Sequence, residues 1–349
     1  MTVKRPTIYD VATRAGVSKS LVSLVLQGSP KVSTASREAV QRAIAELGYR
    51  PSRAAANLAA RRTRSVGVLI DDYTNLWFVD LVRGLHASLG PRGYRLAVVD
   101  VATAGQVEDP LESMLAMRVD GLVLGMDPPR SIIDADGTAL PPVVIAGTRD
   151  MRELPFASVA NDDAEGARIA ARHLVGLGHR RLGQICTGGG AGIARRLAFG
   201  AEAQLLGARV TDAGADGPAT DRAGFDGAHQ LLDVDPAITA IFAANDVLAV
   251  GALGAARDRG RGVPEDLSVV GYDDTSLATA RVIDLTTIDD RSFDVGYQAG
   301  NLLCESMFGG ANEQSAPGRA SGPAPVAVNV ERRVLEPRLV VRGTTAAPR

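Results

Sequence analysis

Residues 65–349 alternate between short apolar runs and amphipathic stretches, and this alternation restricts the fold more than any other feature. Apolar runs suited to buried strands lie at 66–70, 96–100, 121–124, 143–146, 182–186, 240–244 and 267–272. Helical spacing of apolar residues falls between them, at 81–89, 164–177, 197–206, 224–232 and 247–259. Strands that alternate with helices in this way form parallel α/β sheets. Because about 280 residues exceed one compact doubly wound domain, we expect two lobes.

The first fifty residues carry the signals of three short helices. Thr7 and Asp10 have the spacing of a capping box at the start of the first helix, and Gly16 allows the turn that follows it. Ser18 is placed to cap a second helix and Ser33 a third. Two helices joined by a tight turn and backed by a third form a helix-turn-helix unit. We therefore expect an all-α, DNA-binding head at 1–50.

The second helix of such a unit lies in the major groove of DNA. Lys19, Ser20 and Ser23 fall on its polar face and are the expected base-reading side chains. Leu24 falls on the same face, away from the core, so we interpret it as a contact to a thymine methyl group. The alternative is that Leu24 reads no base and that specificity rests on Lys19, Ser20 and Ser23. The other DNA contacts expected in this region are Thr7, Tyr9, Ser18 and Ser33.

Charge is divided unevenly along the chain. Residues 1–64 hold twelve Lys and Arg against three Asp and Glu, a net charge of +9, while the remainder carries −11. A basic head on an acidic body is typical of a nucleic-acid-binding module joined to another domain. The alternative is a three-helix bundle with a solvated basic face and no role in DNA binding.

Residues 51–64 predict a hinge helix. Pro51 ends the preceding helix, and Ser52 can cap a new one of about eight residues, too short to persist alone in water. Its alanines allow two copies to approach closely, which leaves Leu58 as the large apolar side chain suited to wedge between base steps in the minor groove. The contacts expected from this segment are Arg53, Asn57 and Leu58. A frayed linker is the alternative.

The head resembles that of the LacI/GalR family of bacterial transcription factors. The matching stretches are TIYDVATRAGVSKSLVSLVLQG, which begins at Thr7, and VSTASREAVQRAIAELGYRPSRAAANLA, which ends at Ala59. In that family the hinge helix folds on DNA and its leucine, here Leu58, enters the minor groove. Most members carry Arg where this chain has Leu24, and Asn where it has Gln27.

The body resembles the same family and, through it, the sugar-binding periplasmic proteins. The matching pieces are VGVLIDDYTNLWF, VDGLVLG, LGHRRLGQI, TAIFAANDVLAVGAL, VPEDLSVVGYDDT and LTTI. This resemblance implies a two-lobed, periplasmic-binding-protein-like α/β core, crossed by the chain three times, with a ligand in the cleft outside the strand ends. We expect an effector-binding and dimerisation core at 65–349, with one lobe at 65–161 and 290–325 and the other at 162–289 and 326–342.

Polar and aromatic side chains follow several predicted strands at the edge where a ligand binds. Such groups bind a polyhydroxylated ligand through hydrogen bonds and ring stacking, although each can also serve only as a loop cap. Arg196, Asn245 and Asp273 match effector contacts of the family. Gly147 departs from a frequent Asp and Asp290 from a frequent Gln. The expected effector-binding residues are Asp72, Asn75, Trp77, Phe78, Arg196, Asn245, Asp273 and Asp290.

The motifs of other chemistries are incomplete. CTGGGAGIARR, at 186–196, lacks the third glycine of GxGxxG, so we interpret it as a flexible cleft loop that delivers Arg196. The four histidines lack metal-ligand spacing, and Cys186 and Cys304 are expected to be buried thiols. No catalytic residue, metal or cofactor is predicted. The competing hypotheses are a binding protein with a spurious head, opposed by the +9 charge, and a nucleotide-dependent enzyme, opposed by the broken phosphate motif.

We therefore expect a transcriptional regulator, a repressor that is not an enzyme and is controlled by a sugar or sugar derivative. The chain lacks an apolar run of membrane-spanning length and a signal-peptide pattern, so we expect a cytoplasmic, nucleoid-associated protein. Twofold operators are read by twofold proteins, so we expect a homodimer on a pseudo-palindromic site. Partner chains are expected to meet at 81–89 and 296–305.

Leu24 predicts an operator that departs from the family's usual base at one position. A leucine side chain contacts the thymine methyl group, whereas an arginine donates hydrogen bonds to guanine. Selection of bound sites from a random DNA pool, with wild-type and Leu24→Arg protein side by side, measures this difference. We expect only the variant to enrich guanine at that position. The same base preference in both proteins would refute the interpretation.

Overall fold

The computed structural model describes residues 6–26, 28–49, 63–101, 109–133, 140–147, 155–214, 217–313 and 331–349. The chain divides into two compact units, the head at Met1–Thr63 and the body at Arg64–Arg349. Arg53, Asn57 and Leu58, expected to contact DNA from the hinge, lie outside the described residues.

The described residues of the head form three helices: α1 (Ile8–Ala15), α2 (Lys19–Leu26) and α3 (Thr34–Leu47). The expected capping box is present at the start of α1. The backbone N–H of Thr7 donates to Asp10 Oδ2 at 2.7 Å, and the N–H of Asp10 donates to Thr7 Oγ1 at 3.4 Å. Sequence and structure therefore agree on where the first helix begins.

Small apolar side chains hold the three helices of the head together. The buried members of this core are Val11, Ala12, Val22, Val25, Val32, Val40, Ala43 and Tyr49. Helices of eight residues, such as α1 and α2, are marginal in isolation. Their stability therefore comes from this shared burial, which also fixes which face of α2 remains outside.

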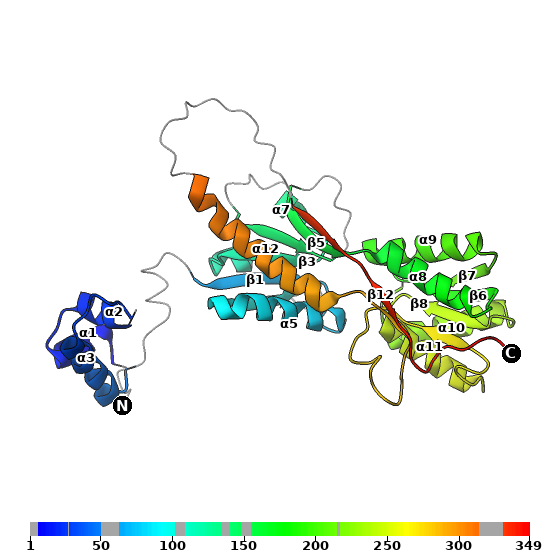
Figure 1. The fold of residues 1–349 in the computed structure, drawn as a ribbon, viewed down its shortest axis with the longest axis horizontal. Coiled ribbons are helices and arrows are strands. Elements are labelled where there is room, and N and C mark those ends of the chain that lie inside the picture. Colours follow the sequence, from blue (N-terminus) through cyan, green and yellow to red (C-terminus); the bar gives the residue numbers. More distant parts are fainter. Residues whose placement is uncertain are drawn as a thin grey trace, which may run out of the picture. The chain divides into compact units, whose positions relative to one another are not determined.

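The first lobe of the body is a six-stranded, wholly parallel sheet in the order β11-β5-β4-β3-β1-β2. Its strands are β1 (Ser65–Ile70), β2 (Arg95–Asp100), β3 (Gly121–Gly125), β4 (Val143–Ala146), β5 (Ala157–Asn161) and β11 (Arg332–Leu335). Helices α5 (Trp77–Leu89) and α12 (Ser292–Glu313) cover one face side by side (Figure 1). Apolar residues of α6 (Pro110–Ala116) and α7 (Arg130–Ile133) pack on the other face.

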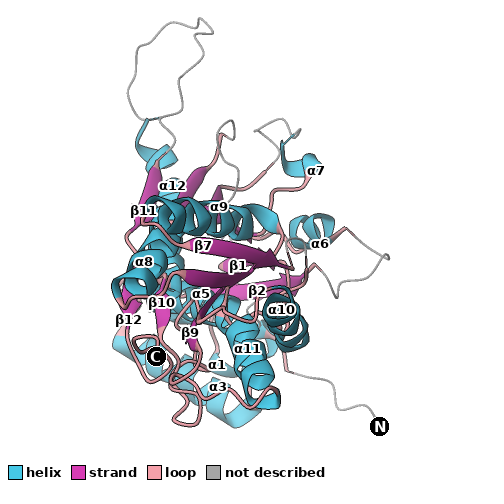
Figure 2. Cartoon of the chain, turned by 90° about the vertical axis from the view of Figure 1, so that its right-hand side faces the viewer, coloured by secondary structure: helices cyan, strands magenta, loops and turns pink. Residues whose placement is uncertain are grey.

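The second lobe is a four-stranded parallel sheet in the order β7-β6-β8-β9. Its strands are β6 (Arg181–Ile185), β7 (Arg209–Ala213), β8 (Ala240–Ala243) and β9 (Ser268–Val270). They lie between the pair α8 (Asp163–Gly176) and α9 (Gly189–Leu205) and the pair α10 (Asp221–Val234) and α11 (Asp246–Asp258), as Figure 2 shows. A short antiparallel pair, β10 (Thr287–Asp289) and β12 (Arg338–Val340), adjoins this lobe.

The chain passes between the lobes three times, at 161–163, 289–292 and 335–338. We expected residues 326–342 in the second lobe, but β11 joins the sheet of the first, where Arg332 pairs with Ser158 (Figure 1). Strand β11 satisfies the outer backbone groups of β5, which need hydrogen-bond partners. The chain then returns to the second lobe only at β12.

Two sequence-based expectations about the elements differ from the structure. Strands β5, β7, β10, β11 and β12 were not predicted, because polar or small residues interrupt or flank their short apolar stretches. The segment expected to be a flexible cleft loop is instead the first turns of α9, which begins at Gly189. Gly192 is required there for close approach, since a Cβ atom would lie 2.4 Å from the carbonyl oxygen of Thr187.

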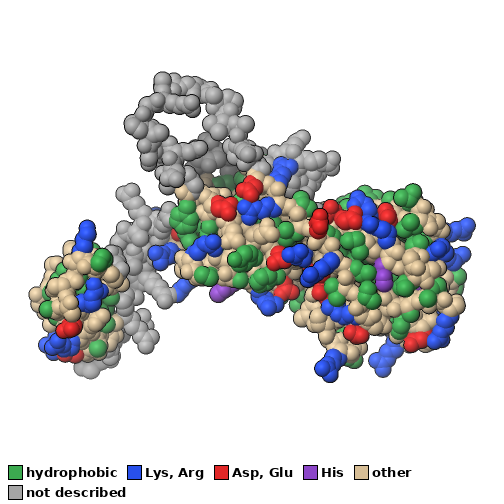
Figure 3. Space-filling model, in the orientation of Figure 1, with side chains coloured by type: hydrophobic (Ala, Val, Ile, Leu, Met, Phe, Trp, Pro, Cys, Tyr) green, Lys and Arg blue, Asp and Glu red, His purple; other side chains and the backbone are tan. Residues whose placement is uncertain are grey.

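The surface of the body shows no dominant charge on the face seen in Figure 3, where acidic and basic side chains are interspersed. Among the described residues, no helix is long and apolar enough to cross a membrane. Cys186 and Cys304 are buried, unpaired thiols, as expected.

The packing of α5 on α12 predicts a strong effect of a single methyl group. A Cβ atom at Gly84 would lie 2.0 Å from the carbonyl oxygen of Phe293, and backbone cannot move aside as a side chain can. We expect Gly84→Ala to lower the free energy of unfolding by about 1–3 kcal/mol. Urea denaturation, followed by the fluorescence of the single tryptophan, measures this.

Gly176 in α8 provides the matched control. A Cβ atom there has no neighbour within 4 Å, so Gly176→Ala should be neutral or stabilise by up to about 1 kcal/mol. Equal midpoints for Gly84→Ala and the wild type would contradict the predicted clash.

Candidate functional site

Helix α2 presents one face of mixed polarity to solvent. Val22 is buried in the core of the head, while Lys19 and Ser20 are exposed and Ser23 is half-buried. Leu24 is 37% exposed and has no place in that core. The four side chains expected to read bases therefore lie together on the outer face of one helix.

The other DNA contacts expected in the head surround α2 or hold helix ends. Tyr9 is exposed, and Lys19 Nζ donates to its hydroxyl at 3.3 Å while lying 5.0 Å from the ring centre. Ser18 Oγ accepts a hydrogen bond from the N–H of Leu21, and Ser33 Oγ accepts one from Ser36. Ser18 and Ser33 therefore act as helix caps, whereas the Tyr9–Lys19 pair adds an aromatic ring and a charge to the outer face.

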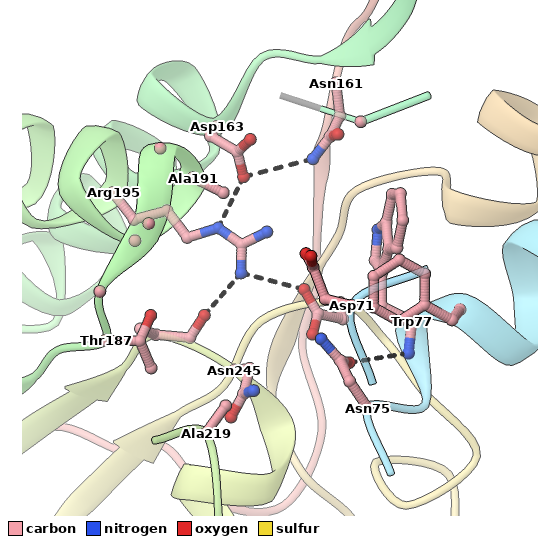
Figure 4. A pocket seen from close by; sticks show the side chains of 18 of the residues that line it. Asp71, Asn75, Trp77, Asn161, Asp163, Thr187, Ala191, Arg195, Ala219 and Asn245 are labelled. Carbon is pink, nitrogen blue, oxygen red and sulfur yellow. Dashed lines mark hydrogen bonds and ion pairs between the residues drawn. The ribbon is translucent and has the colours of Figure 1, made fainter. Parts of the chain in front are cut away.

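A cavity of about 300 Å³ lies between the lobes of the body, at the carboxyl ends of the strands (Figure 4). The first lobe contributes Asp71, Asn75, Trp77, Phe78, Asp127, Gly147 and Asn161. The second contributes Asp163, the segment 187–192, Arg195, Gly217, Ala219, Ala244, Asn245 and Asp273. This position agrees with the general rule for ligands of open α/β sheets.

Arg195 is the central cation of the cavity. Its Nε donates to Asp163 Oδ1 at 2.6 Å, and Nη1 donates to Asp273 Oδ1 at 3.0 Å and to the carbonyl oxygen of Ala244 at 2.6 Å. The guanidinium carbon lies 3.6 Å from the ring centre of Tyr272, a cation–π contact. Arg195 is thus fixed by carboxylates at its edge and by an aromatic ring against its plane.

Asp290 is fully buried next to the cavity, and its side chain contacts residues of both lobes. Its Oδ2 accepts a hydrogen bond from Trp77 Nε1 at 2.7 Å and from Asn161 Nδ2 at 3.0 Å. The same oxygen lies 3.7 Å from Nη2 of Arg195. A single carboxyl group on the crossing segment therefore connects α5, β5 and α9.

Burial and mutual repulsion shift the titration of these carboxyl groups. Burial, reinforced by the charges of Asp246 and Asp163, raises the pKa of Asp273 to about 8 although Arg195 opposes the shift. Burial and the nearby Asp273 likewise raise the pKa of Asp290 above its ordinary value. Burial opposes the charge of Arg195, but the surrounding carboxylates hold the pKa of its guanidinium above the ordinary value.

Five of the eight expected effector-binding residues line the cavity: Asn75, Trp77, Phe78, Asn245 and Asp273. Asp290 lies fully buried behind them. Asp72 is not in the described lining; its carboxylate instead accepts hydrogen bonds from the N–H and hydroxyl of Thr74. Asp72 is therefore a loop cap, and the adjacent Asp71 lines the cavity.

The arginine in the described lining of the cavity is Arg195, one position before Arg196, the residue that we expected there. In helix α9 the buried face is formed by Gly192, Arg195 and Phe199, at intervals of three and four residues. Arg196 lies about 100° further around the helix. The helical spacing of these residues was the available signal, but the loop interpretation of 186–196 concealed it.

Asn161 and Asp163 were missed together. Asn161 is the last residue of β5 and Asp163 lies two residues later, and the Ala and Ser residues of this strand gave no apolar run, so the cleft edge beside it was not recognised. Asp127 and Gly147 follow the predicted strands β3 and β4 and lie on the same edge. Position at or just after the end of a strand was therefore the signal for Asp127, Gly147, Asn161 and Asp163.

Comparison with known proteins identifies the family to which this chain belongs. Residues 7–52 match the profile of bacterial regulatory proteins of the lacI family, and residues 171–345 match that of the periplasmic binding protein-like domain. The chain is 34% identical to the HTH-type transcriptional regulator CelR of Thermobifida fusca, over 97% of this chain and 98% of CelR. The chain belongs to the LacI family of bacterial regulators. It therefore has a DNA-binding helix-turn-helix head and a periplasmic-binding-protein-like core, which confirms the predicted fold class.

Two solved structures illustrate the family likeness. A complex of the regulator CelR with cellobiose has a TM-score of 0.65 and 30% sequence identity, and covers 97% of this chain and 100% of its own. The lac repressor dimer bound to operator and the anti-inducer ONPF has a TM-score of 0.83 and 28% identity, with coverage of 99% and 100%. Both the head and the body thus have counterparts in regulators of transcription.

The raised pKa of Asp273 predicts how a substitution responds to pH. The folded protein binds a proton at Asp273 between its ordinary value, 3.8, and about 8, so this group's contribution to stability is lost as pH rises through that interval. Asp273→Asn removes the titration. We therefore expect the variant to gain stability relative to wild type as pH increases from about 5 to about 8.

Urea denaturation across that pH range measures the difference, with Asp72→Asn as the control because Asp72 caps a loop outside the described lining. The control should follow wild type. A difference between Asp273→Asn and wild type that stays constant with pH would contradict the shift.

Proposed function

We propose that this LacI-family protein is a repressor that binds a pseudo-palindromic operator as a homodimer, and that a sugar or sugar derivative in the cavity sets its operator affinity. The observation that carries the effector part is the composition of the cavity. Trp77 and Asn75 come from one lobe and Arg195, Asn245 and Asp273 from the other, so a bound ligand contacts both. Occupancy therefore bears directly on the angle between the lobes.

The chemistry of the lining suits a ligand rich in hydroxyl groups. Asn75 and Asn245 each use the side-chain oxygen to accept a backbone N–H, from Trp77 and Leu248. Their side-chain NH₂ groups are left to donate, alongside acidic acceptors and an aromatic wall. The complex of CelR with cellobiose supports a carbohydrate ligand for a relative of this chain.

Control of DNA binding follows from a shift in population between lobe angles. A ligand that fits one angle better increases its population by the difference in affinity for the two states. The head is joined to the first lobe at Arg64, directly before β1. A change in lobe angle can therefore alter the spacing of two heads in a dimer, and with it the fit to two half-sites.

The proposed dimer surface lies on α5 and α12, with a change from the sequence-based expectation. Leu81, Leu85 and Leu89 are buried in the core of their own lobe and are not available to a partner. Val79, Phe293 and Tyr297 are exposed on these helices, and the rings of Phe293 and Tyr297 stack at 6.5 Å. These outer residues are the contacts we propose. The lac repressor dimer is the structural precedent.

The proposal places the protein in the cytoplasm beside the nucleoid, as a regulator and not an enzyme. Its relatives are transcriptional regulators, and the lining groups are explained by ligand binding without a reaction.

Operator binding in the presence of sugars and amino sugars tests this function. We expect at least one compound to change the affinity for a selected operator, and Arg195→Ala to lose the response because it removes the central cation of the cavity. Arg196→Ala is the matched control and should respond as wild type does. Fluorescence anisotropy of labelled operator measures both. A normal response by Arg195→Ala, or failure of the protein to select any operator, would overturn the proposal.

A further inference from the structure

Among the described residues around Arg195, carboxyl groups outnumber cations. The lining of the cavity contains the carboxyl groups of Asp163 and Asp273 beside the guanidinium of Arg195. Asp290 adds a further carboxyl group behind the lining, 3.7 Å from Arg195. Each of the three carboxyl groups around Arg195, and Arg195 itself, is between 0% and 8% exposed.

The N–H groups of Arg195 do not donate a hydrogen bond to every carboxylate oxygen of this cluster. Nε and Nη1 are committed to Asp163, Asp273 and the carbonyl oxygen of Ala244. Asp163 Oδ2 is buried and has no hydrogen-bond partner, although Asp163 Oδ1 also accepts from Asn161. Among the described residues, this cluster therefore has three carboxyl groups for one cation, and Asp163 Oδ2 accepts no hydrogen bond.

Buried carboxylates without compensating charge are costly, so this cluster retains protons. The raised pKa values of Asp273 and Asp290 are the sign of this. Among the described residues, the titratable and charged groups that face the cluster are Asp163 from α8, Arg195 from α9, Asp246 at the start of α11, Asp290 before α12 and the phenol of Tyr272 after β9. A ligand that brings a fixed positive charge replaces those protons, whereas a neutral ligand leaves the imbalance unchanged.

We propose that the effector carries a positively charged amine among its hydroxyl groups, as an amino sugar does, and that the amine lies beside Asp163 and Asp273. This inference rests on the proposed function and narrows its ligand class. An ammonium group supplies donors as well as charge, and charge-assisted hydrogen bonds are the stronger kind. Trp77 and Phe78, at 5.1 Å and nearly perpendicular, offer ring surfaces to the rest of the ligand.

The remaining groups of the cavity suit the neutral part of such a ligand. The first turn of α9, at 189–191, borders the cavity, and the N–H groups at a helix start have no partners within the helix. They can donate to hydroxyl and ring oxygens of a sugar. The acidic cluster therefore contacts the amine of the ligand, and the start of α9 contacts the hydroxyl and ring oxygens of the same ligand.

Matched compounds test the inference on the full chain. Trp77 is the single tryptophan and lines the cavity, so its fluorescence reports binding. Glucosamine, galactosamine and mannosamine are titrated at about pH 7, each against glucose, galactose or mannose. We expect at least one amine to bind about tenfold more tightly than its hydroxyl counterpart. Calorimetry in two buffers of different ionisation enthalpy should show proton release, because an ammonium group lowers the pKa of Asp273.

Substitutions locate the amine. Asp163→Asn, nearly equal in shape, should weaken binding of the amine about tenfold more than it weakens binding of the matched neutral sugar. Asp163→Glu, which keeps the charge, should retain amine binding better than Asp163→Asn. Asp72→Asn is the control and should bind both as wild type does. Thermal unfolding of each variant shows whether it is folded.

The outcomes separate this inference from the function on which it rests. A neutral sugar that binds as tightly as its amine, or no binding by any of the three amines, overturns the inference. Unchanged amine binding by a folded Asp163→Asn overturns it as well. If a neutral sugar alone alters operator affinity, the proposed function stands and only the amine is refuted.

Discussion

The guanidinium of Arg195 is the contact on which the arrangement of the cleft depends. It draws together Asp163 at the start of α8, Asp273 after β9 and, at longer range, Asp290 on the segment between the lobes. Asp290 in turn holds the indole of Trp77 from the first lobe. The apolar cores, by contrast, are confined to separate lobes. The lobes thus meet at the cleft through polar contacts, and a change in their angle there need not open either core.

Strain and charge coincide at this site. Asp273 has a φ of 97°, in a region that few residues other than glycine adopt. Unusual backbone angles persist where surrounding contacts enforce them, and they are concentrated at functional sites. Asp273 is held by Arg195 and by a backbone hydrogen bond from its N–H to the carbonyl oxygen of Ile288. The residue with a strongly shifted pKa is therefore also one whose geometry is imposed by its neighbours.

Much of the fold followed from the sequence because local signals and burial agreed. Apolar runs located the central strands of both sheets, and Thr7 located the start of α1 through its cap. Strand β5 was missed because it carries Ala, Ser and Asn instead of a continuous apolar run, and Asp163 was missed with it. Arg196 was chosen over Arg195 for its match to effector contacts of the family, and the loop interpretation of 186–196 hid the helical phase that brings Arg195 to the cavity. Tertiary contacts decide such positions, and a single sequence does not contain them explicitly.

The three crossings between the lobes have a consequence for how this protein can be recombined. Each lobe is assembled from separated stretches of chain, since β11 completes the first sheet and β12 returns to the second lobe. A single cut anywhere from β1 to β12 therefore leaves at least one lobe incomplete. Exchange of one lobe between relatives requires three junctions to be matched at once, whereas the head is joined to the body at one place, near Thr63. The head, and with it DNA specificity, can therefore be exchanged at a single junction. The two lobes that together form the ligand cavity have to be exchanged as one unit.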